Sequence, residues 1–186
     1  MQRWALLGFA LFMLILPQIC LPPDTGADQG CDPWVSRIVS LQGQVSSKSR
    51  DGNQWRTVRL NDTFCPGDTI HVALHSRAAF TLSNESLLRV DQNTTVVFSG
   101  IEKPKTFLIQ LIEGAAHFFS RKTRSLKVVT PFVNGVVEGT EFLVQVDADK
   151  ALLALFEGHL RAENDQGTLL LTRSQTALAK AAQPGA

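Results

Sequence analysis

Short stretches in which apolar and polar residues alternate recur along the chain and constrain its fold more than any other feature. In residues 69–74, 77–82 and 141–146 every second residue is apolar, which is the period of a β-strand with one buried face. No segment keeps a helical period, apart from the first residues and the last few. Turn signals separate the stretches at Asp51-Gly52-Asn53, Cys65-Pro66-Gly67-Asp68, Ser83-Asn84, Asn134-Gly135 and Gln166-Gly167. We therefore expect an all-β fold, a single domain of many short strands arranged as a rolled or solenoid-like β-sandwich.

Two of the strand-like segments, residues 107–112 and 152–156, are apolar at nearly every position. Strands with this composition are usually covered on both faces, whereas a strand in a sheet with one solvent-exposed face alternates apolar and polar residues. We expect both segments to be buried in the middle of the fold.

A weak internal repeat joins an apolar segment to Glu or Gln, then Gly, then a second apolar segment. Residues 111–116 (Leu-Ile-Glu-Gly-Ala-Ala) resemble residues 155–160 (Leu-Phe-Glu-Gly-His-Leu), and residues 41–45 are a fainter copy. Because Gly can adopt positive φ, each copy predicts a sharp bend or reversal, at Gly114 and Gly158 in the two clear copies. Stacked bends favour a solenoid-like or rolled fold, although the same pattern is common in β proteins generally.

The first 27 residues have the features of a secretory signal peptide. Arg3 precedes an unbroken apolar run over residues 5–16, which is shorter than the ~20 residues of a membrane span and fits a secretory core of ~7–15. Small residues at Thr25-Gly26-Ala27 suit cleavage, which would leave a domain over residues 28–182 and a tail over residues 183–186. An uncleaved membrane anchor is the alternative, since only one positive charge precedes the run.

The three cysteines fit an exported chain. Removal of the leader removes Cys20 and leaves Cys31 and Cys65, and an even pair in an oxidising compartment predicts a disulfide. Two unrelated buried thiols are the alternative. A metal site is a poorer one, because neither cysteine has further Cys or His ligands nearby.

Composition and motifs argue against nucleic-acid binding and catalysis. The chain has 18 Lys and Arg against 17 Asp and Glu, whereas nucleic-acid binders have a basic excess. His71 and His75 have the spacing of a helical metal pair, but in a strand they would lie ~13 Å apart. Glu113 and Glu157 occupy equivalent turns of the repeat, and no nucleophile elbow, phosphate loop or dinucleotide turn occurs. We therefore expect that the protein is not an enzyme and that it binds no cofactor.

The ordered set of strand and turn motifs resembles the FecR domain, a bacterial periplasmic β module. The resemblance extends over roughly residues 34–179 and includes a Pro-Gly-Asp turn, a Glu-Gly bend, and a Thr-Pro pair followed at fixed spacing by Gly-Thr-x-Phe. It implies an all-β extracytoplasmic domain with a function in signalling or protein–protein contact. The motif positions, to which we assign structural functions, are Gly67, Asp68, Gly114, Pro131, Gly139, Thr140, Phe142 and Gly158.

One departure from the sensor proteins of that family bears on function. Those sensors resemble a cytoplasmic helical domain that regulates a sigma factor, then a membrane span, then this module. Here only a few residues precede the apolar run, so we do not expect this chain by itself to be an anti-sigma factor. It also resembles exported proteins in which the module precedes tetratricopeptide repeats, and is expected to be the leading domain of such a protein or a shortened relative.

A basic cluster joins two apolar segments at residues 120–125. Arg121, Lys122 and Arg124 lie between strands that must be buried, so we expect them together at the surface. They could contact an acidic partner, lipid headgroups or a wall polymer. The alternative is a solvated turn that protects a sheet edge.

Taken with the resemblance, these features predict a non-catalytic periplasmic signalling or scaffold module that binds another envelope protein. It is expected to bind no nucleic acid, and to contact the membrane only through an uncleaved leader, in which case it would be anchored in the inner membrane. The alternative is a carbohydrate- or peptidoglycan-binding β module of the envelope, with Trp34 or Trp55 stacking on sugar rings.

Overall fold

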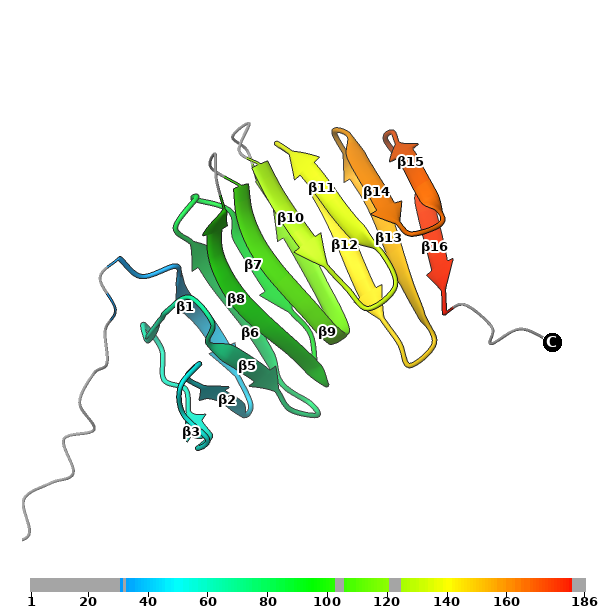
Figure 1. Cartoon of the computed structure of the whole chain (residues 1–186). Helices are drawn as coiled ribbons and strands as arrows, with labels where there is room; N and C mark the ends of the chain where they lie inside the picture. The colour runs from blue at the N-terminus through cyan, green and yellow to red at the C-terminus, as the bar shows by residue number, and fades with distance from the viewer. Residues whose placement is uncertain (1–30, 32, 103–105, 121–124, 182–186) are drawn as a thin grey trace, which may run out of the picture.

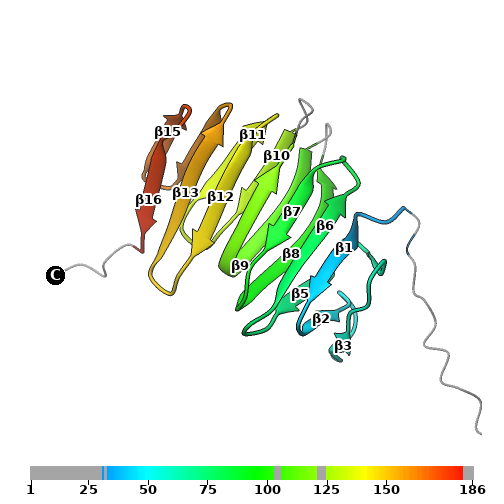
Figure 2. The same cartoon turned by 180° about the vertical axis from the view of Figure 1, so that it is seen from behind.

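The computed structural model describes residues 31, 33–102, 106–120 and 125–181, and within them it contains sixteen β-strands and no helix. The strands form one open hydrogen-bonded array folded into two layers, called sheets A and B here (Figures 1 and 2). This confirms the predicted all-β fold. The predicted leader (1–27) and tail (183–186) lie outside the described residues, and no helix in the described part could cross a membrane.

Both sheets follow the chain in nearly sequence order. Sheet A has the order β4 (Thr63–Phe64), β1 (Ser36–Gln42), β6 (Arg77–Leu82), β7 (Leu87–Val90), the second half of β9 (Thr106–Phe119), β12 (Glu141–Val146), β13 (Lys150–Glu157) and β16 (Thr176–Lys180). Sheet B has the order β3 (Arg56–Thr57), β2 (Val45–Lys48), β5 (Thr69–Val72), β8 (Thr94–Glu102), the first half of β9, β10 (Ser125–Val129), β11 (Asn134–Glu138), β14 (Leu160–Asn164) and β15 (Gly167–Leu171). Among the described strands β9 and β10 form the parallel pair, and the other pairings are antiparallel.

Strand β9 belongs to both layers and makes them one array. Up to Glu113 it pairs with β8 and β10 in sheet B, and from Gly114 onward it pairs with β7 and β12 in sheet A. The rest of the chain crosses repeatedly from one layer to the other, so successive strands extend both sheets together (Figure 1).

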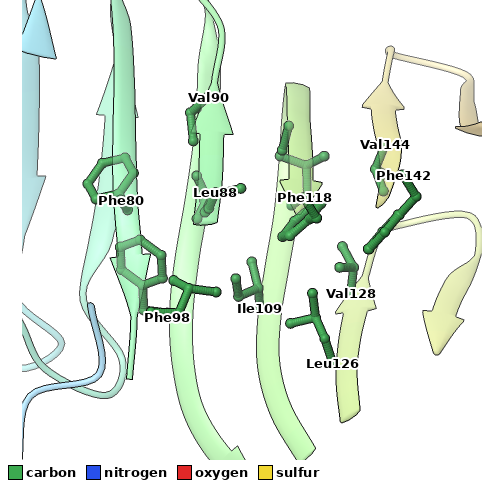
Figure 3. Close-up of a cluster of buried hydrophobic side chains, with 14 of the residues drawn as sticks. Phe80, Leu88, Val90, Phe98, Ile109, Phe118, Leu126, Val128, Phe142 and Val144 are labelled. Atoms are coloured by element: carbon green, nitrogen blue, oxygen red, sulfur yellow. The ribbon is translucent and has the colours of Figure 1, made fainter. Parts of the chain in front are cut away.

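The core lies between the two layers and consists of the inward residues of nearly every strand. Phe64 and Phe80 of sheet A contact Phe98 of sheet B, with ring centroids 5.9 and 5.4 Å apart, and Phe118 stacks on Phe142 at 4.8 Å. Figure 3 shows these side chains, except Phe64, pointing into the space between the layers. Full burial of one such side chain contributes about 1.5–3 kcal/mol, so this aromatic layer helps hold the two sheets together.

The weak sequence repeat corresponds to a repeated structural corner. Gly43 lies between β1 and β2, Gly114 at the bend of β9, and Gly158 between β13 and β14. All three have positive φ, at 78°, 89° and 89°. The predicted bends are therefore present, and at each of them the chain passes from one sheet to the other.

A hydroxyl group from another turn completes two of these corners. Ser76 Oγ accepts a hydrogen bond from the Gln44 N–H at 2.8 Å, and Thr94 Oγ1 accepts one from the Ala115 N–H at 3.0 Å. Both donors directly follow the corner glycine. The bend removes these N–H groups from the sheet ladder, and the hydroxyl satisfies them.

Two expectations from the sequence are wrong. Residues 107–112 and 152–156 are not buried on both faces: their inward residues are buried, but Ile112 and Phe156 are about half exposed. The described strands form only two layers, and none of them covers the outer face of either sheet. The turn expected at Asn134-Gly135 is also wrong, because both residues belong to strand β11.

Gly139 joins β11 of sheet B to β12 of sheet A, and so lies between strands rather than within one. Its φ is 60°, in the region where a β-branched residue is strained. Gly139→Val is expected to lower the free energy of unfolding by at least ~1 kcal/mol, measured by urea denaturation. Glu138→Gln, at an exposed neighbour, should leave it unchanged; equal stability of Gly139→Val and the parent would contradict the assignment.

Candidate functional site

A groove of about 650 Å³ lies at one end of the sandwich. The β12–β13 hairpin, which lines part of it, is at the lower end in Figure 1. Four turns or bends line the groove. They are the β7–β8 turn (residues 91–93), the β9 corner (112–115), the β10–β11 turn (131–132) and the β12–β13 hairpin (145–148). The predicted motif residues Gly114 and Pro131 both lie here.

The bend of β9 is what brings these turns together. On one side of Gly114 the register pairs Glu113 with Thr95 of β8, and on the other it pairs Gly114 itself with Val146 of β12. Strand β10 runs parallel to the first half of β9, so it also ends at this corner. Ends of β8, β10 and β12, from both sheets, therefore lie around one glycine.

The Thr-Pro motif forms the apolar rim of the groove. Thr130 Oγ1 donates to the Val133 carbonyl at 2.6 Å and accepts from the Val133 N–H at 3.0 Å, which closes a tight turn. The turn holds Pro131 at the surface and Phe132 half buried against the core. Together with half-exposed Ile112 across the groove, they offer an apolar contact surface.

Carboxylates form the polar side of the groove. The backbone N–H of Gln92 donates to Asp91 Oδ1 at 2.9 Å and Arg77 Nε donates to it at 3.1 Å. These two hydrogen bonds hold the pKa of Asp91 below its usual value, and the bond from Gln92 has the larger effect. Asp91 therefore stays ionised at neutral and mildly acidic pH.

Glu113 differs from the other two carboxylates of the groove. Asp91 is paired with Arg77, and Asp147 lies 3.8 Å from Lys150 Nζ. Glu113 accepts a hydrogen bond from Thr95 Oγ1 at 2.8 Å and has no cationic partner within the described ranges. Its negative charge is thus the one left available to a ligand.

The cysteines and motif residues that do not line the groove lie in three parts of the described structure. Cys31 and Cys65 form the predicted disulfide, with Cα atoms 5.5 Å apart. Next to it, Asp68 Oδ2 accepts the Cys65 N–H at 2.9 Å, and Gly67 donates its N–H to Phe98. The disulfide therefore ties the start of the domain to the β4–β5 turn.

The second group lies at the other end of β12 from the groove, since β12 pairs Val146 with Gly114 but Glu141 with Phe119. There, a side chain on Gly158 would collide with Thr140 Cγ2 and approach the Gly139 carbonyl. Gly139, Thr140 and Gly158 are thus in contact. Phe142 is fully buried in the core, while Arg121, Lys122 and Arg124 lie outside the described residues.

The histidines of the described sheets have ordinary polar partners. His71 lies on the outer face of β5, between buried Ile70 and Val72, and its Nδ1 is 3.1 Å from Thr95 Oγ1. His117 Nε2 lies 3.0 Å from Glu141 Oε1, and its ring packs edge-on against Phe156. Across residues 31, 33–102, 106–120 and 125–181, no three His, Cys, Asp or Glu side chains gather as metal ligands would.

The sequence patterns do not single out Asp91, Asn93 and Asp147, which line the groove. Each lies in an ordinary polar turn, and turn composition alone does not distinguish a site. The usable signal was Phe132, an apolar residue directly after the Thr-Pro pair, where a plain surface turn would be polar.

Comparison with known proteins agrees with this architecture. The sequence model of the family described as FecR protein matches residues 68–161, from the Pro-Gly-Asp turn through the last Glu-Gly corner. The chain belongs to the FecR family. FecR-family proteins are regulatory and typically associated with the cell envelope, which makes this FecR domain a signalling module.

Solved structures show the same fold. Two crystal structures, at 1.65 and 2.50 Å resolution, of a candidate anti-sigma factor from Parabacteroides distasonis ATCC 8503 each match with a TM-score of 0.55 and 16% identity. Each match covers 60% of this chain and 54% of that protein, so the FecR domain spans about half the length of this relative. A search of curated protein sequences finds no match.

Proposed function

We propose that this FecR domain is an exported, non-catalytic signalling or scaffold module of the bacterial envelope that binds another protein through the groove around Gly114. The observation that carries the proposal is the groove itself: an apolar rim, amide side chains and one unpaired carboxylate lie together at strand ends. Membership of a regulatory, envelope-associated family supports a protein partner.

The lining indicates the chemistry of that partner. Gln92, Asn93 and Gln145 carry amide groups that suit the backbone of an extended peptide, and Phe132 offers it an apolar contact. Glu113 would pair with a Lys or Arg of the same peptide. The groove therefore fits an extended segment of the partner that carries a basic residue. Arg121, Lys122 and Arg124 remain proposed as a second contact, for an acidic surface.

Photo-crosslinking in the native host tests this proposal. A photoreactive p-benzoylphenylalanine at position 112, in the groove, should give one discrete protein adduct, and the same residue at position 101, on an exposed part of β8, should not. Identical adducts at both positions, or none at 112, would contradict the groove as the contact.

Glu113→Lys should reduce the adduct yield at least about tenfold, because a charge-assisted hydrogen bond contributes about 1.5–3 kcal/mol and each 1.4 kcal/mol is tenfold. Glu157→Lys is the matched control: it occupies the equivalent exposed position of the repeat but lies away from the groove. An equal loss with both variants would indicate a general charge effect.

Exposed Trp55 supports a second candidate, an envelope carbohydrate- or peptidoglycan-binding module. Its side chain, directly before β3, is about half exposed. Lys48 Nζ lies 5.4 Å from the ring centroid, and the His71 ring packs edge-to-face with it. An aromatic ring beside hydrogen-bonding groups can stack on a sugar. Retention on purified peptidoglycan that Trp55→Ala abolishes would favour this function over protein binding.

A further inference from the structure

The end of the sandwich formed by the last two strands is open. Strand β15 is the last strand of sheet B and β16 the last of sheet A, and each pairs on one side with β14 or β13. No described strand covers their outer edges. Figures 1 and 2 show both at the red end of the molecule, one in each layer.

The hydrophobic core reaches solvent at this end. Leu169 lies opposite buried Ala162 and so faces the inside of the sandwich, yet 53% of it is exposed. Ala177 and Ala179 of the facing strand pair with buried core residues and are only partly covered. Inward-facing apolar residues that remain exposed indicate a surface that another element covers.

The edges themselves lack the features that prevent strand pairing. Natural edge strands carry charges, proline or bulges, or are very short. Strand β15 reads Gly-Thr-Leu-Leu-Leu, with no charge and no proline, and β16 carries one charge, Lys180, at its end. At the opposite end of the sheets, the outermost strands β3 and β4 have two residues each. The two ends are thus protected differently, and the β15–β16 end is left competent to pair.

We propose that the β15–β16 end binds a second copy of this chain, edge to edge, with β15 against β15 and β16 against β16. A twofold axis perpendicular to both layers reverses the strand direction and keeps each layer in place, so both new pairings are antiparallel. Uncharged edges can meet their own copies without repulsion. The Leu169 side chains of the two copies then close the open core against each other. The proposal does not depend on the groove.

The size of the surface sets the strength of the dimer. Residues 167–180 supply fourteen residues per copy, and an interface of ~800 Å² per partner uses about 20–30. This end therefore offers roughly 450 Å² per copy, which is near the lower limit of specific interfaces. The dissociation constant is expected to be ~10 μM or weaker.

Sedimentation equilibrium of the purified protein, as the cell produces it, tests the proposal. Its mass should rise from monomer toward dimer between roughly 1 μM and 1 mM. Leu170 and Leu178 are exposed on the outer faces of β15 and β16, so a lysine there leaves the core intact but places charge beside the new pairing. Leu170→Lys and Leu178→Lys should each weaken the dimer about tenfold or more.

Leu74→Lys is the matched control, since Leu74 is an equally exposed leucine (57%) in the turn after β5. It should dimerise like the parent. Amide hydrogen exchange should slow in β15 and β16 as the concentration rises. Three results would each overturn the two-edge dimer. They are a protein that stays monomeric at every concentration, a weaker dimer with Leu74→Lys, and a dimer that Leu170→Lys weakens but Leu178→Lys does not.

Discussion

Phe98→Ala is expected to lower the free energy of unfolding by about 3–5 kcal/mol, the range for removing a fully buried aromatic side chain. Phe98 is inaccessible to solvent and extends from sheet B to the rings of Phe64 and Phe80 in sheet A. The substitution therefore leaves a cavity between the layers and also removes two aromatic contacts. Such contacts contribute about 0.5–1.5 kcal/mol each beyond their buried area.

Urea denaturation followed by tryptophan fluorescence measures this change. Ile101→Ala is the control, because Ile101 lies on the same strand, β8, with 63% of its surface exposed. Its effect should stay within about 0.5 kcal/mol. A Phe98 variant as stable as the Ile101 variant would mean that the aromatic layer does not hold the two sheets together.

The same strands show what the sequence determines about this fold and what it does not. The alternating segment 69–74 is wrong at its end, because Leu74 lies in the turn after β5 with 57% of its surface exposed. At the other positions of residues 69–74, 77–82 and 141–146, alternation correctly assigns the buried face of the strand, because it records which side chains avoid water. It carries no information about how many layers cover a sheet. Ile112 and Phe156 were expected to be buried because their segments are apolar at nearly every position, but the two-layer architecture leaves them half exposed.

The groove is harder to predict than the fold, because its lining depends on non-local strand order. The sequence identifies a bend at Gly114, and this bend is present. It marks Pro131 only as a motif position and does not predict the tight turn that Thr130 closes there. It does not indicate that β10 runs parallel to β9, which places the two turns side by side. Asp147 joins them only through the pairing of β12 with the far half of β9. A site made of turns that are distant in sequence follows from topology, not from any one motif.

Gly114→Ala is expected to lower the free energy of unfolding by about 3 kcal/mol, from two causes that add. The φ of 89° strains any L side chain, at about 1 kcal/mol or more. A Cβ at this position would also lie 2.6 Å from both the Asn93 carbonyl oxygen and Thr94 Cα. Both are backbone atoms of the neighbouring turn, which cannot rotate away, and overpacking of this kind costs about 1–3 kcal/mol.

The clash also has a consequence at the groove. Moving the backbone at Thr94 would displace Thr94 Oγ1 from the Ala115 N–H that it caps, and with it the β7–β8 turn that lines the groove. Gly114→Ala should therefore lower both the melting temperature and the crosslinking yield at position 112. Gly52→Ala is the control, because its φ is ordinary and the nearest atom is the movable Oγ of Ser49. If Gly114→Ala proved as stable as Gly52→Ala, the corner would tolerate a side chain. In that case the close approach of β8 to the bend of β9 would not determine the shape of the groove.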